Sequence, residues 1–138
     1  MVEHRKEAIV IELPLPPDCL HPNSRPHWRA KAAAAKATRE HACLVARTVR
    51  PKTPFKAASY RLTFWLARKR DYDGLLTWCK NVIDGLQDGG IIVNDSDFRP
   101  DGIVRYSGQK QTGGKVGVRF EIWEESTPST RTAIGGGE

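Results

Sequence analysis

Cysteine is scarce in this sequence of 138 residues, and long hydrophobic runs are missing. The three cysteines, Cys19, Cys43 and Cys79, are far apart and form no CxxC pair, so neither a zinc site nor a disulfide framework is expected. We interpret them as free thiols of a reducing compartment. No apolar run approaches the roughly 20 residues of a membrane helix, and the N-terminus lacks a signal-peptide pattern. These absences predict a cytoplasmic protein without a membrane partner.

Several catalytic motifs are also missing. The sequence contains neither a GxxxxGK[ST] phosphate loop nor an HExxH pair. A calcium loop starting at Asp71 or Asp95 would require Glu at its twelfth position, which Val82 and Tyr106 occupy. All four histidines precede residue 42, which argues against a nucleophile–base arrangement elsewhere in the chain.

Acidic residues are few in the first half of the chain. Residues 1–70 contain 15 Lys and Arg against 5 Asp and Glu, whereas residues 71–138 contain 7 against 11. A basic region of this kind attracts polyanions, of which nucleic acid is the commonest in a cytoplasm. The alternative is a soluble basic protein without such a partner.

The hydrophobic pattern predicts one α+β domain at residues 1–125. Alternation indicates strands at residues 8–15, 58–67, 102–109 and 116–124, with a short apolar strand at 91–93. Helix formers predict helices at about 27–49 and 75–88, with a loop at 18–28. We expect one mixed sheet with two helices packed against it. Residues 126–138, rich in Ser, Thr and Gly, are expected to be disordered.

Acidic side chains occur at two positions that a fold could bring together. Asp71 and Asp73 follow the strand 58–67 and the basic run 68–70, and in an extended segment both carboxylates point to one side. Asp95, in the segment 94–97, would supply a third carboxylate. Three such oxygen ligands suit Mg²⁺, and basic residues beside them suit phosphate. The pattern is typical of a phosphodiester-cleaving enzyme, although Asp73 as a helix cap and Asp95 as a turn former remain alternatives.

The chain resembles the RusA family of Holliday junction resolvases, particularly its short phage and prophage forms. The resemblance extends from about Ile9 to Glu121. It consists of Leu13-Pro14-Leu15-Pro16-Pro17, Pro22-Asn23-Ser24-Arg25-Pro26-His27-Trp28, Asp71-Tyr72-Asp73-Gly74-Leu75, Lys80, Asp84-Gly85-Leu86, Gly90-Ile91-Ile92 and Asn94-Asp95-Ser96.

The resemblance implies a RusA-like fold and a Mg²⁺-dependent endonuclease, with Mn²⁺ able to substitute. Such an enzyme would resolve four-way DNA junctions by paired symmetric nicks during recombination and repair, in a bacterial or phage-infected host cytoplasm. The family's metal ligands would correspond to Asp71, Asp73 and Asp95, and its essential lysine to Lys80. Reasoning from the residues alone gives Lys80 another role, an ion pair with Asp84 one helical turn away.

The sequence departs from the family pattern at three positions. Gly74 replaces a frequent Asn, and Asn94 replaces a frequent acid before Asp95. Lys80 lies three residues farther from the Asp pair than the lysine of the best-known members does. The position of that lysine is occupied by Thr77 in this sequence.

Eight residues are predicted to contact DNA through the phosphate backbone. They are Asn23, Arg25, His27, Arg29, Lys31, Arg68, Lys69 and Arg70. Two alternatives remain open: a DNA-binding module without catalysis, and a metal nuclease that cuts flaps or other branched DNA. Two cuts on opposed strands require two sites, so a two-fold homodimer is expected. Its interface would use at least one of Trp65, Trp78 and Trp123.

Overall fold

The computed structural model describes residues 8–22, 24–25, 27–68 and 74–125. Four strands form one sheet: β1 (Ile9–Leu13), β2 (Ala58–Leu66), β3 (Phe98–Ser107) and β4 (Gly117–Glu124). Their order across the sheet is β1-β4-β2-β3. β4 is antiparallel to both of its neighbours, whereas β2 and β3 are parallel. The sheet is therefore mixed, as the sequence predicts, and the domain is α+β.

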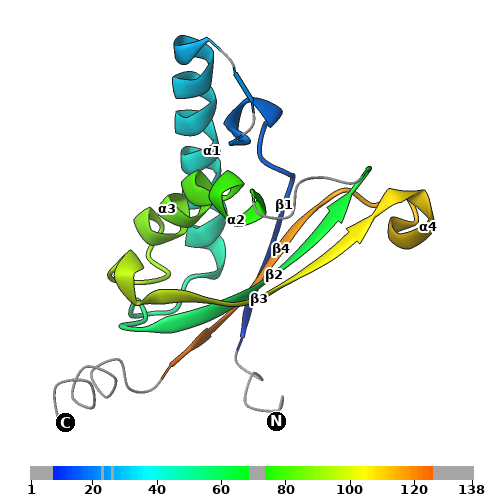
Figure 1. Ribbon diagram of the computed structural model, residues 1–138. Helices are drawn as coiled ribbons and strands as arrows, with labels where there is room; N and C mark the ends of the chain where they lie inside the picture. The colour runs from blue at the N-terminus through cyan, green and yellow to red at the C-terminus, as the bar shows by residue number, and fades with distance from the viewer. Residues whose placement is uncertain (1–7, 23, 26, 69–73, 126–138) are drawn as a thin grey trace, which may run out of the picture.

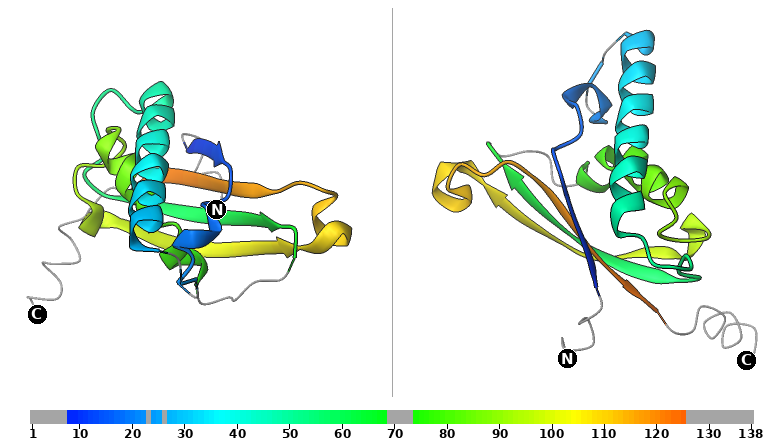
Figure 2. Two further views of the ribbon diagram at one scale, coloured as in Figure 1. Left: turned by 90° about the horizontal axis from the view of Figure 1, so that it is seen from above. Right: turned by 180° about the vertical axis from the view of Figure 1, so that it is seen from behind.

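Four α-helices accompany the sheet: α1 (Trp28–Val49), α2 (Leu75–Trp78), α3 (Lys80–Asp88) and α4 (Gly108–Thr112). In both figures α1, α2 and α3 lie on the same face of the sheet, and α4 lies beyond the far end of β3 (Figures 1 and 2). The N-terminal half of α1 extends past the sheet (Figure 1). No helix among the described residues is long and apolar enough to span a membrane.

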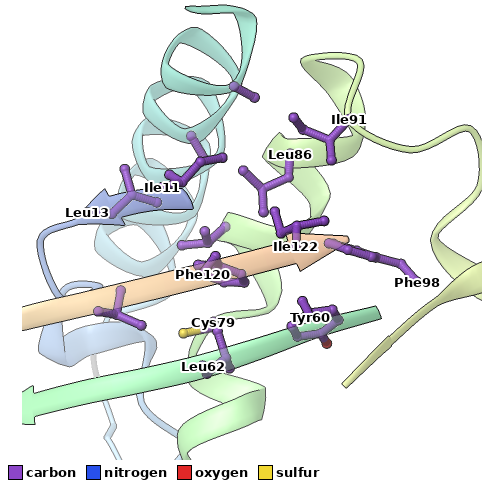
Figure 3. Close-up of a cluster of buried hydrophobic side chains, with 14 of the residues drawn as sticks. Ile11, Leu13, Tyr60, Leu62, Cys79, Leu86, Ile91, Phe98, Phe120 and Ile122 are labelled. Atoms are coloured by element: carbon purple, nitrogen blue, oxygen red, sulfur yellow. The ribbon is translucent and has the colours of Figure 1, made fainter. Parts of the chain in front are cut away.

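The core lies between the sheet and the three helices. Alternate residues of β2, from Ala58 to Leu66, point into it, together with Ile11 of β1 and Phe120 of β4. Leu86 of α3 packs against these strands from the helix side (Figure 3). The period-2 alternation that predicts β2 thus arises because only one face of the strand is covered by helices.

The helix predicted at residues 75–88 is interrupted. Cys79 has φ −91° and ψ 6°, which separates α2 from α3. The apolar stripe of this segment nevertheless points inward: Leu75, Cys79, Val82 and Leu86 are buried, and Ile83 is half-buried. Trp78, expected as possible interface material, is also in the core, and its indole N–H donates to the carbonyl of Pro17 at 2.8 Å.

Three further expectations about local structure need correction. Residues 91–93 form no strand, since only Ile92 makes an isolated bridge, with Phe55. β3 begins at Phe98, four residues before the predicted start, and its register against β2 shifts by one residue between Tyr60 and Arg61. The predicted loop 18–28 contains a 3₁₀ turn, η2 (Asp18–Leu20). The predicted disordered tail, 126–138, lies outside the described residues.

α1 and α3 approach each other through small residues. A Cβ built on Gly85 would lie 2.3 Å from the Arg39 carbonyl oxygen and 2.7 Å from the Cβ of Ala42. A Cβ on Gly89 would lie 2.5 Å from the Cβ of Ala46. At the edge of this contact the Arg39 guanidinium donates to both carboxylate oxygens of Asp88, at 2.6 and 3.0 Å. The small residues Ala42 and Ala46 of α1 therefore allow a close contact with α3.

Two ionisable groups in the core predict a loss of stability in alkali. Burial raises the pKa of Cys79 from 9.0 to about 12, and burial followed by the nearby Cys79 raises that of Tyr60 from 10.0 to about 12. Both groups ionise first in the unfolded chain, so the stability they contribute is complete below pH 9 and falls as pH rises toward 12. Urea unfolding midpoints should decrease over this range, less steeply above pH 10 in Tyr60→Phe. Identical profiles for the two proteins would contradict the role of Tyr60.

Candidate functional site

The predicted metal ligands Asp71 and Asp73 lie outside the described residues, as do Asn23, Lys69 and Arg70. The residues on either side of the segment 69–73 are described. Arg68 is exposed, just after the C-terminal end of β2, and Gly74 is buried at the start of α2. One strand thus ends shortly before the acidic pair in the chain, and one helix begins directly after it.

Gly74 packs against the residues that follow η2. A Cβ at this position would lie 3.1 Å from both the His21 ring and the Pro22 ring. His21 is itself buried and meets Trp78 edge-on, with ring centroids 5.4 Å apart. An Asn at position 74, frequent in the resembled family, would need His21 or Pro22 to move. The glycine and the proline-rich segment thus fit each other, which the sequence alone does not reveal.

Asp95 lies at a different end of the sheet from Arg68. It begins η3 (Asp95–Asp97), which leads directly into β3. Phe98 pairs with Ala58, whereas Ser107 pairs with Leu66, so η3 adjoins the start of β2 and Arg68 adjoins its end. Eight residue steps of strand span about 26 Å. Within one subunit the described backbone does not bring Asp95 to the strand end from which Asp71 and Asp73 follow.

The turn around Asp95 has local hydrogen bonds of its own. The Asn94 side-chain oxygen accepts from the Ser96 N–H at 3.0 Å, and the Asn94 carbonyl accepts from the Asp97 N–H at 3.0 Å. Asn94 therefore acts as a turn-forming residue.

Lys80 begins α3 and is largely exposed. Its ammonium lies 3.6 Å from Asp84 Oδ2, in the i,i+4 geometry predicted for a helix pair. Arg39 Nη1 lies 3.9 Å from the same oxygen. Lys80 thus forms the ion pair with Asp84 that the residues alone predict. To contact a phosphate, the lysine would have to leave Asp84.

The predicted DNA contacts of the first half gather where α1 begins. Arg25, His27, Arg29 and Lys31 are all exposed there. His27 caps the helix, since its Nδ1 accepts from the Arg29 N–H at 3.1 Å. Trp28 is 68% exposed, stacks on His27 at 5.9 Å and lies 5.2 Å from the Arg29 guanidinium carbon. An exposed aromatic ring among cations is the combination that binds nucleic-acid strands.

Within the described part of the chain, no three His, Cys, Asp or Glu side chains group closely enough to hold a metal ion. The predicted ligands Asp71 and Asp73 are not part of that set, because they lie outside the described residues. Carboxylate pairs of this kind match the hard oxygen ligands that Mg²⁺ prefers. No model of a known protein family matches the chain, and neither does any curated protein.

Proposed function

We propose that this protein is a divalent-metal-dependent endonuclease that acts on branched DNA, with four-way junctions as its substrate. One observation carries the proposal: the segment that contains Asp71 and Asp73 is flanked on both sides by described residues that lead to cations. It starts after the exposed Arg68 and ends at Gly74, which packs on His21 and Pro22. Pro22 in turn leads to the basic, aromatic start of α1.

The residues divide the work of phosphodiester cleavage between them. Asp71 and Asp73 would hold Mg²⁺, which supplies water activation and neutralises charge on the phosphate. The cations at the start of α1 and Arg68 would bind backbone phosphates on either side. Asp95 stays the predicted third ligand: η3 adjoins the start of β2, and the positions of Asp71 and Asp73 lie outside the described residues.

A DNA-binding module without catalysis is a second candidate, and two observations favour it. Lys80 is engaged by Asp84, and the residues around Asp95 form an ordinary capped turn. This alternative keeps the basic start of α1 as the DNA-binding surface and assigns the acids to caps and turns.

One gel assay separates these functions. Labelled four-way junction, flap and linear duplex would each be incubated with Mg²⁺, with Mn²⁺ and with a chelator. The proposal expects symmetric nicks in the junction that require the metal. Binding without cleavage under every condition would favour the module, and preferential flap cutting would change the substrate while keeping the nuclease.

Paired nicks also imply a homodimer, for which the helix-free face of the sheet is available. On this face Trp65 stacks on Tyr106 at 5.9 Å, and Trp123 is half-buried. Light scattering should give twice the single-chain mass of 15.4 kDa at micromolar concentration. Val104→Asp, on the same face, should dissociate the dimer, whereas Val93→Asp, on the loop after α3, should not. A single-chain mass at all concentrations would contradict the stable dimer but not the nuclease.

A further inference from the structure

A cavity of about 620 Å³ opens at the end of the β2–β3 pair. It is formed by the residues that follow β2, by the last residues of β3 and by α4. Figure 1 shows this end of the sheet lying away from α1 and α3. The cavity is therefore a feature of the part of the sheet that those two helices leave open.

Three cations from three elements line the cavity: Arg68 after β2, Arg105 in β3 and Lys110 in α4. All its other described lining residues are neutral. Three positive charges, with no carboxylate among the described lining residues, create a positive potential inside a concave surface, where field lines concentrate. Such a cavity selects an anion.

The strand register explains why Arg105 lines the cavity. Arg105 pairs with Phe64, and Ser107 pairs with Leu66, so both lie on the face of the sheet that elsewhere carries the core. At Ile103 this face of β3 is still apolar and packs on the core. Past that point the residues of β3 on this face are polar. The sequence of β3 thus changes from core to cavity lining along one face.

Ser107 adds a hydrogen-bond donor to the cavity. Its hydroxyl oxygen is buried and has no hydrogen-bond partner among the residues that the structure describes. Its backbone N–H donates to the side-chain oxygen of Gln111 at 2.7 Å, which fixes α4 against the end of β3. A buried hydroxyl without a partner is unfavourable, so a ligand oxygen that accepts from it would recover this cost.

We propose that this cavity binds a phosphate group of the DNA backbone, beside the strand end that leads to Asp71 and Asp73. This inference rests on the proposed function and adds Arg105, Lys110 and Ser107 to its DNA-binding residues. Arginine provides a planar fork of donors for phosphate oxygens, and lysine a compact charge. A phosphate bound here would place a DNA strand beside Arg68, three residues before Asp71 in the chain.

Binding of a fluorescent four-way junction, measured by anisotropy in Ca²⁺ across a salt series, tests the inference without cleavage. Arg105→Gln and Lys110→Gln should each weaken binding by about tenfold and make the log affinity–log salt slope shallower by about one unit. Arg99→Gln, on β3 outside the cavity, and Lys52→Gln, before β2, are the matched controls and should leave both quantities unchanged. Urea midpoints equal to wild type would show that each variant is folded.

A second measurement uses inorganic phosphate as the probe. In ¹H–¹⁵N spectra, phosphate should shift the amide signals of Ser107 and Gly108 saturably, compared with chloride at equal ionic strength, and Lys110→Gln should abolish the shift. Wild-type affinity and slope in both cavity variants would overturn the inference while leaving the nuclease intact. A wild-type protein that binds no DNA would overturn both proposals, even if the phosphate shifts persisted.

Discussion

Asp71→Asn and Asp73→Asn are each expected to lower the rate of junction cleavage by about a thousandfold. Metal activation of water lowers the activation free energy by several kcal/mol, and each 1.36 kcal/mol corresponds to a factor of ten in rate. Asparagine keeps the size of the side chain but removes the charge that holds Mg²⁺. Junction binding should remain intact or become tighter, because a carboxylate that repels phosphate is lost. Single-turnover cleavage and anisotropy on the same junction measure the two effects.

Three further variants show which other residues belong to the site. Asp97→Asn, two residues beyond the predicted ligand, should cleave at nearly the wild-type rate. Asp95→Asn, in the turn that adjoins the start of β2, should abolish cleavage as expected for a third ligand; a wild-type rate would remove Asp95 from the site. Lys80→Gln should slow cleavage and leave stability almost unchanged, since exposed ion pairs contribute about 0–1 kcal/mol. Wild-type rates in both Asp71→Asn and Asp73→Asn would exclude the proposed metal site.

Gly85→Ala is expected to destabilise the fold by about 2 kcal/mol or more. The added Cβ would meet the Arg39 carbonyl oxygen at 2.3 Å, and this atom belongs to the backbone of α1, so the helices must separate. Overpacking of a core costs about 1–3 kcal/mol and occasionally more, and a backbone obstacle belongs at the upper end. The better helix propensity of alanine offsets about 1 kcal/mol of this.

Gly102→Ala is the matched control for that experiment. At Gly102 the nearest atom to an added Cβ is the Arg61 Nε at 3.9 Å, an ordinary contact. Its free energy of unfolding should stay within about 0.5 kcal/mol of wild type, as for most surface substitutions. Equal urea midpoints for the two variants would contradict the close approach of α1 and α3.

The sequence predicted most strands and the long helix because their burial is one-sided. β2 alternates over its whole length. α1 begins after a capping residue and ends shortly before a proline, so both elements were located within one or two residues. The break at Cys79 was not predictable, because the apolar stripe continues on both sides of it. Residues 91–93 show the limit of an apolar run: Ile91 and Ile92 are buried beside Phe55 without forming a strand.

For the candidate site, the sequence indicates the types of residues involved but not how they are arranged in space. Consecutive cations such as 68–70 are visible in the sequence, but Arg105 and Lys110 approach Arg68 only because β3 is parallel to β2 and α4 turns at its end. The buried His21 gave no signal, since its environment depends on Gly74 and Trp78 more than 50 residues away. Contacts of this kind arise from the topology and have no local pattern.

The order of the strands also sets when the sheet can be completed during synthesis. β1 is an edge strand that pairs in the described sheet with β4 alone, from Leu13 opposite Val118 to Ile9 opposite Ile122. At about 5–20 residues per second, the roughly 100 residues between them take the ribosome about 5–20 s. During this interval β1 has no partner strand for its backbone hydrogen bonds. The nascent chain is therefore exposed to chaperones or to aggregation until its last strand emerges.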